Sequence, residues 1–261
     1  MGVNDKWIEE FCKEINKKPF IDYIGSEVLK PGTELKVYKD AIYEGYLDAC
    51  RTLKKTEKRI QKDDEKLDHI AGIMKDYIED DGACKFENIH KALCDEVMEK
   101  YEMTYGHAQK IINMAFKYLF CLTKDLKEGE KNQIQQKFDK CHIPLDGTML
   151  EWYVRNVGSK IDGFKKGKIK SWSCLEYGPD DEDEDGSYTY CYFVKHISRF
   201  CEDNKITPLQ VDFENWKLLQ LKMAAENLIF SMNNSLNRDE IRNEKLSDNL
   251  KRIEGLIKSY K

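Results

Sequence analysis

The sequence predicts an all-α protein built from roughly ten helices. Apolar residues return every three or four positions in one segment after another, which is the spacing of an amphipathic helix. No two strongly alternating stretches meet around a hairpin turn, so the strand signal is weak. With 261 residues, of which 41% are hydrophobic and 35% charged, the chain can bury a sizeable core beneath heavily charged helical surfaces.

Each expected helix follows from its own apolar spacing or from a start or stop signal. In chain order the helices cover residues 5–17, 39–55, 67–78, 86–101, 107–122, 131–139, 147–158, 188–201, 213–232 and 241–257. Pro19 ends the first helix, and the pair Thr207–Pro208 resembles a helix start. Residues 20–38 carry Gly, Pro and β-branched residues, which favour either a minor β element or a packed loop.

The helices are expected to form a single all-α unit over residues 1–261. The alternative is a division into two helical lobes with a cleft between them. One lobe would hold residues 1–85 plus 187–261, and the other residues 86–186. No internal repeat of fixed period occurs, so a helical solenoid is not supported.

The composition favours a cytoplasmic protein without membrane, metal or cofactor. No apolar run approaches the length of a membrane span, and the first residues carry charges where an export signal would be apolar. The nine cysteines indicate reduced thiols. Cys191, His196 and Cys201 are five residues apart on one expected helix, so their side chains cannot converge on a metal. Sequence motifs for phosphate loops, dinucleotide binding, zinc proteolysis and serine hydrolysis are absent.

The charge is unevenly distributed along the chain. The net charge is −5, yet residues 107–170 contain thirteen Lys and Arg against seven Asp and Glu, a local charge of +6. A local basic region is what phosphate binding needs, because counterion release depends on the charges at the contact. The six consecutive carboxylates of residues 180–185 indicate a hydrated insertion, with DNA mimicry or cation binding as alternatives.

Two short motifs lie within the basic region. In the first, a helix ending at Tyr101, the turn "EMTYG" and a helix beginning near His107 form a helix-hairpin-helix outline. Gly106 can take the backbone angles of such a turn, and the free amides of the second helix would face a phosphate. Lys110 and Lys117 are seven residues apart, so both are expected on the polar face of that helix.

The second motif is "HIPLD", where Pro144 stiffens an extended approach and Asp146 falls at the N-cap of the following helix. Ordinary capping explains an isolated Asp at such a position. Two exposed lysines likewise need no special explanation. It is the combination of the two motifs that indicates a function.

Taken together, "AQKIINMAFKYL" and "HIPLDGTML" resemble the catalytic segment of the helix-hairpin-helix DNA glycosylases, most closely the archaeal 8-oxoguanine glycosylase branch. The matching features are a Gln-Lys pair opening a helix, a second Lys two turns later, and an apolar-Pro-apolar-Asp segment before the next helix. They correspond here to Gln109, Lys110, Lys117, Pro144 and Asp146. The matched region covers roughly 45 residues. Three features depart from the family pattern. They are a longer loop between Lys117 and Asp146, a hairpin signature reduced to Gly106, and the acidic run of residues 180–185.

The resemblance implies a DNA glycosylase, with hydrolase or lyase activity in DNA repair. Lys110 would attack the sugar of a flipped nucleotide and form a Schiff base, for which its amine must be neutral. Asp146 would stabilise the positive charge that develops on the sugar.

The remaining candidate residues would contact the DNA. Tyr105, Phe116 and Trp152 could wall a base pocket. The candidate DNA contacts are Gly106, His107, Gln109, Lys117, Lys165, Lys166, Lys168 and Lys170. The expected partner is duplex DNA with one base flipped out. A non-catalytic helical module that binds nucleic acid, and an interaction protein with no nucleic-acid role, are the alternatives.

Overall fold

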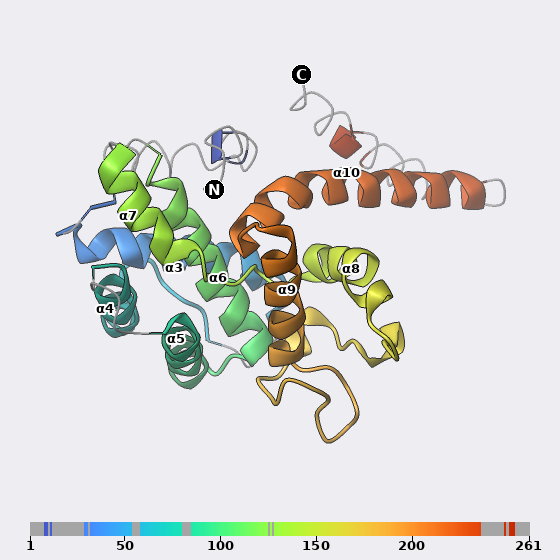
Figure 1. The fold of residues 1–261 in the computed structure, drawn as a ribbon, viewed down its shortest axis with the longest axis horizontal. Coiled ribbons are helices and arrows are strands. Elements are labelled where there is room, and N and C mark those ends of the chain that lie inside the picture. The colour runs from blue at the N-terminus through green and yellow to red at the C-terminus, as the bar shows by residue number, and fades with distance from the viewer. Residues whose placement is uncertain are drawn as a thin grey trace.

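The computed structural model describes residues 8, 9, 11, 29–30, 32–53, 58–79, 85–124, 126, 128–235, 248 and 251–253. Over these residues the regular structure is helical, and the only extended pairing is one isolated bridge between Glu182 and Tyr188. The all-α class is therefore confirmed (Figure 1).

The helices follow the predicted order closely. They are α3 (Leu35–Ala49), α4 (Lys66–Glu79), α5 (Phe86–Tyr101), α6 (Tyr105–Cys121), α7 (Glu128–Phe138), α8 (Gly147–Asn156), α9 (Tyr190–Asn204) and α10 (Pro208–Ser235). Short 3-10 turns, η1 to η4, cover Cys50–Thr52, Gly158–Lys160, Lys166–Lys168 and Trp172–Cys174. Most of the first and last predicted helices lies outside the described residues, although Ile8, Phe11 and residues 251–253 are helical.

Helix α10 begins five residues earlier than its apolar spacing predicts. Pro208 is its first residue, and the Thr207 hydroxyl accepts a hydrogen bond from the Gln210 amide at 3.2 Å. The Thr-Pro pair thus acts as the helix start that it resembles in the sequence.

The expectation of a β element within residues 20–38 is not met where the structure describes that segment. Residues 20–28 and 31 lie outside the described residues, and residues 29–30 and 32–34 form no strand. Val37 and Tyr38 belong to the first turns of α3, where both are buried. Their β-branched and aromatic side chains are core contacts of a helix.

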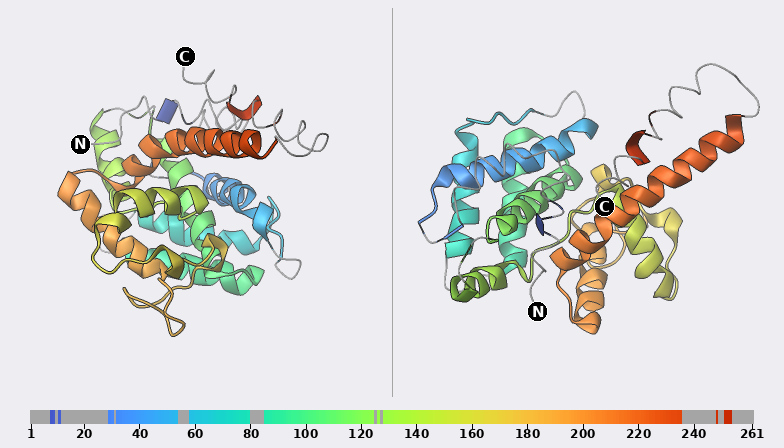
Figure 2. Two further views of the ribbon diagram at one scale, coloured as in Figure 1. Left: turned by 90° about the vertical axis from the view of Figure 1, so that its right-hand side faces the viewer. Right: turned by 90° about the horizontal axis from the view of Figure 1, so that it is seen from above.

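Helix α6 is the centre of the molecule. All seventeen of its residues are buried, whereas the other helices keep exposed faces. Helices α3, α4, α5 and α7 lie on one side of it, and α8, α9 and α10 lie on the other (Figures 1 and 2). The long α10 then extends away from the body as an arm.

Helices from both of the predicted lobes pack against each other. That division placed a boundary between residues 85 and 86, yet α3 packs along α6 across it. Gly45 permits the close crossing, because a Cβ there would come within 3.2 Å of the Ile111 carbonyl carbon. The observed grouping joins residues 35–138 on one side and residues 147–235 on the other.

The hairpin between α5 and α6 differs in detail from its predicted form. Glu102 takes the left-handed conformation at φ 54°, and Gly106 lies inside the first turn of α6. Gly106 is needed for space, because a Cβ there would lie 2.8 Å from the Ser173 carbonyl carbon and closer still to the Trp172 carbonyl oxygen. The turn η4 therefore covers the start of α6.

Neither membrane insertion nor disulfide bonding is seen in the described part of the chain. None of its helices combines the length and apolar character that crossing a bilayer needs. Its seven cysteines are all free thiols.

Candidate functional site

The two lysines of α6 lie in the interior, which corrects the expectation of an exposed polar face. Lys110 is 7% exposed and Lys117 is 1% exposed. A helical wheel places them on one face, as predicted. That face is covered by α8, α10 and η4, each of which brings a carboxylate or an aromatic ring to an amine.

Lys110 and Asp146 meet although they are far apart in the chain. The Lys110 Nζ lies 3.1 Å from the Asp146 Oδ2, and the side chains are 9% and 17% exposed. The pair is therefore largely screened from water while keeping an edge open to it. The two residues that the sequence predicts to be catalytic are therefore in contact with each other.

Asp146 uses its two carboxylate oxygens for different tasks. Oδ1 caps α8 by accepting hydrogen bonds from the amides of Thr148 at 2.9 Å and Met149 at 3.1 Å. Oδ2 is left to face Lys110. Asp146 can therefore cap α8 and pair with Lys110 at the same time, and the cap fixes the direction in which its Oδ2 points.

An indole ring covers the Lys110 amine. The Nζ lies 4.7 Å from the centre of the Trp172 ring, within cation–π range. The same ring packs nearly at right angles to the His107 ring, with a centroid distance of 5.3 Å. Trp172 is only partly buried, so it forms the outer wall of the site.

A second ion pair, between Lys117 and Asp212 of α10, lies beside the first. Both side chains are 1% exposed. Burial raises the pKa of Asp212, and the negative charge of Asp146 adds to that rise while Lys117 and Lys110 oppose it. The four charged groups therefore form one electrostatic unit.

Aromatic rings surround the Lys117 amine. Its Nζ lies 4.0 Å from the ring centre of Phe11, 4.7 Å from that of Phe213 and 5.7 Å from that of Trp216. The first two rings are buried and Trp216 is partly exposed. Sequence reasoning did not single out Asp212, Trp172 or Trp216. The available signal was a carboxylate between two apolar residues, Val211 and Phe213, in the first turns of a helix.

Three other predicted DNA contacts are engaged inside the protein. His107 lies 2.8 Å from the Thr104 hydroxyl and 3.0 Å from the Thr52 hydroxyl. Gly106 is covered by η4. Gln109 is fully buried and bonds to the main chain of Leu145. Their contact with DNA stays a prediction, and for Gly106 and His107 it requires that η4 move.

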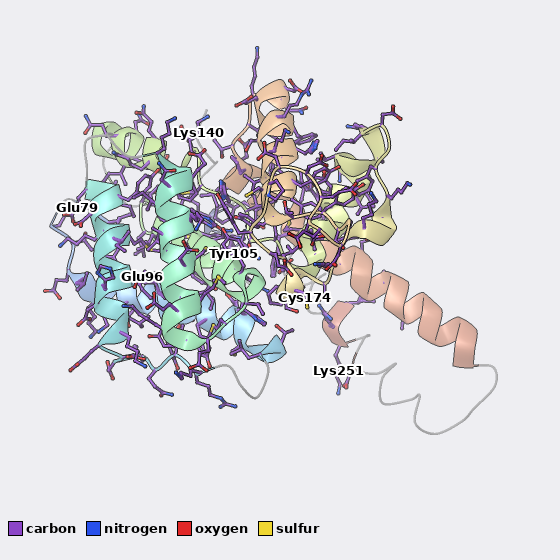
Figure 3. All side chains as sticks on the ribbon, turned by 90° about the horizontal axis from the view of Figure 1, so that it is seen from below. Glu79, Glu96, Tyr105, Lys140, Cys174 and Lys251 are labelled. Carbon is purple, nitrogen blue, oxygen red and sulfur yellow. The ribbon has the colours of Figure 1, made fainter. Side chains whose placement is uncertain are left out.

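The rings predicted to wall a base pocket have core partners instead. Phe116 packs against Phe86 and Tyr77. Trp152 contacts Phe200. Tyr105 packs against Tyr190 and Tyr177, and with Cys174 it lines a surface groove where the start of α6 meets the chain after η4 (Figure 3). The ring that faces the Lys110 amine is Trp172.

The lysines of residues 165–170, hereafter the lysine string, are exposed or partly exposed, and Lys166, Lys168 and Lys170 pair with acids of the same protein. Lys166 contacts Glu151 at 3.3 Å, and Lys168 pairs with Glu182. Lys170 reaches Asp183 at 2.6 Å. The acidic run of residues 180–185 thus folds back on the string and partly neutralises it.

No protein-family model, curated protein or solved structure matches this chain. The class that the fold defines is a multi-helix globular protein. A functional assignment for it rests on the two sequence motifs and on the geometry of the site.

Proposed function

We propose that the protein is a DNA glycosylase-like enzyme that removes a modified or damaged base, with lyase activity through Lys110. The observation that carries the proposal is the 3.1 Å contact between Lys110 and Asp146. Each residue belongs to one of the two motifs that resemble the family. The two residues are 36 positions apart in the chain, and their contact in a largely buried position supports the proposal.

The chemistry follows from the two groups. The neutral Lys110 amine attacks C1′ of the deoxyribose, and the bond from C1′ to the base breaks as the base leaves with the bonding electrons and takes up a proton. The ring oxygen then leaves C1′ and is protonated, which gives the Schiff base. Loss of a C2′ proton expels the 3′ phosphate and cuts the strand.

Asp146 supports two of these steps. In the resting arrangement the ammonium form of Lys110 has two favourable partners, Asp146 and the Trp172 ring. Oδ2 is in place to accept the proton that the amine must lose before it attacks. As a carboxylate fixed by the α8 amides, Asp146 also stabilises positive charge on the sugar.

Substrate binding would use the walls of this site and the nearby surface. Trp172 and Trp216 are partly exposed aromatic rings next to the paired lysines, and a flipped base can stack on such rings. The lysine string directly precedes Trp172 in the chain. Phosphates bound by these lysines would therefore be held by residues next to the Trp172 ring in the sequence.

Borohydride trapping tests the proposal. The protein is mixed with duplexes that contain 8-oxoguanine, uracil or an abasic site, and the covalent complex is measured on denaturing gels. Lys110→Gln should abolish trapping, and Asp146→Asn should slow base removal by about 100-fold or more. Lys195→Gln, which alters a surface lysine paired with Asp180, is the matched control and should react normally. Failure of the unmutated protein to be trapped on any duplex would refute the lyase proposal.

One observation favours a second candidate, a helical protein-interaction module without nucleic-acid binding. Three lysines of the string, Lys166, Lys168 and Lys170, are already paired with carboxylates of the same protein, and the start of α6 is covered by η4. Gel shifts on native DNA separate the candidates. Binding that weakens with salt, and that charge reversal at Lys165 and Lys166 reduces, would exclude the interaction module.

A further inference from the structure

A cluster of buried polar side chains lies behind the candidate site. It consists of His90 from α5, Gln109 and Asn113 from α6, His142 from the segment before α8, and Tyr190 from α9. All five are at most 7% exposed. Polar groups removed from water in this way are strongly destabilising unless they bond to each other.

The Tyr190 hydroxyl is the centre of the cluster. It lies 2.9 Å from His142 Nδ1, 3.1 Å from Asn113 Nδ2 and 3.3 Å from His90 Nε2. Burial lowers the pKa of His90 to about 3 and that of His142 well below its ordinary value, so both rings are neutral. We therefore assign the hydroxyl proton to the shortest contact, with His142 Nδ1 accepting, while Asn113 and His90 donate to the oxygen.

From Tyr190 the hydrogen bonds run to the segment that ends at Asp146. Asn113 Nδ2 also lies 3.1 Å from the Ile143 carbonyl oxygen and 3.1 Å from Gln109 Oε1, so its two N–H groups are shared among three acceptors. The Gln109 amide then bonds both main-chain groups of Leu145, donating to its carbonyl at 2.9 Å and accepting from its N–H at 3.2 Å. Residues 143–145 belong to no helix, so these side chains take the place of a regular hydrogen-bond ladder.

We propose that Tyr190 and Asn113 are positioning residues of the Lys110–Asp146 site. They fix residues 143–145 against α6, and because Asp146 follows directly, they set where its Oδ2 stands relative to the Lys110 amine. The geometric part stands on the hydrogen bonds alone. Its catalytic consequence rests on the proposed glycosylase function.

The test for the geometric part needs no DNA. Accessible amines are methylated with formaldehyde and cyanoborohydride, and modification at Lys110 is followed by mass spectrometry as a function of time at one fixed pH. Asp146→Asn removes the carboxylate that holds the amine, so the Lys110 modification curve should become faster by about fivefold. Tyr190→Phe keeps the ring and removes only the hydroxyl, and it should move the curve in the same direction by a measurable part of that change.

Tyr192→Phe is the matched control, because it removes a hydroxyl from the same helix outside the cluster, and its Lys110 curve should match the unmutated protein. Asn113→Ser repeats the test by breaking the link from Tyr190 to Gln109, in case the phenylalanine variant fails to fold. A purely structural role would lower the melting temperature and leave the Lys110 curve in place. That result in both variants would overturn the proposal.

A second measurement addresses catalysis. On abasic duplex DNA, Tyr190→Phe should lower the single-turnover trapping rate and leave the Kd for DNA unchanged. Unchanged trapping by Tyr190→Phe, with normal trapping by the unmutated protein, would contradict the catalytic consequence. If the unmutated protein is never trapped, the proposed function fails while the methylation curves still decide the positioning role.

Discussion

The lysines of α6 and three lysines of the string, Lys166, Lys168 and Lys170, are paired with carboxylates, but in different surroundings. The Lys117–Asp212 side chains are 1% exposed, whereas Lys166 of the string is 68% exposed. In the interior each charge requires its partner, because water cannot replace it. At the surface the pairs are screened and exchangeable. The same pairing therefore builds a fixed site in one region and a replaceable contact in the other.

The largest effect is expected from breaking the buried pair. Lys117→Met leaves the Asp212 carboxyl alone in the core, which should lower the free energy of unfolding by about 3–5 kcal/mol. Since burial already raises the folded-state pKa of Asp212, the loss should grow as pH rises through the carboxyl range.

Urea denaturation at several pH values measures this loss. The double variant Lys117→Met/Asp212→Leu removes both charges and should recover most of the stability. If Lys117→Met were as stable as the unmutated protein, the Lys117–Asp212 pair would not be buried as described.

The next largest effect is a loss of folding stability at low pH. His90 and His142 are buried and neutral when folded, with lowered pKa values, but take up protons when unfolded. The stability that these two neutral histidines contribute is fully present above about pH 6.5, the pKa of a histidine in the unfolded chain. It is lost as the pH falls below that value. At about pH 5, protonation of His90 in the unfolded state should destabilise the fold by about 2 kcal/mol, and His142 should act in the same direction.

Thermal or urea unfolding across that pH range checks the prediction. His90→Gln should flatten the dependence, and His69→Gln should leave it unchanged, because the His69 side chain is 62% exposed. Equal slopes in all three proteins would show that the buried histidines do not carry the effect.

A smaller effect distinguishes the two roles of Asp146, which caps α8 and carries the charge that pairs with Lys110. Asp146→Ala removes the cap of α8 and should lower the free energy of unfolding by about 1 kcal/mol. Asp146→Asn keeps a good cap, so its stability should stay closer to that of the unmutated protein even though Lys110 loses its partner. Urea denaturation of both variants makes the comparison, and the reverse order of stability would contradict the capping geometry.

The smallest effect belongs to the surface. Lys168→Gln together with Lys170→Gln should leave the Tm without measurable change, because both pairs are partly solvated. If the string binds phosphate, the same variant should flatten the salt dependence of DNA binding in gel shifts. A clear fall in Tm would show that the string is a structural clamp.

Local signals in the sequence predicted the helices well and the site only in part. Apolar spacing located α4 and α5 nearly to the residue, and "HIPLD" marked the Asp146 cap. Asp212 was missed because it meets Lys117 across 95 residues, and a helical wheel cannot show what covers a polar face. Trp172 was missed for the same reason, since its neighbour Lys110 lies 62 residues earlier.

The position of the two carboxylates has a consequence for how the chain is made. Both arrive from the second half of the sequence, on residues 146 and 212, while the two ammonium groups they neutralise are on α6. An emerging polypeptide that has finished α6 cannot yet enclose it without trapping bare positive charge. We therefore expect the central helix to stay accessible to water until α10 has left the ribosome, so that final closure comes late in synthesis.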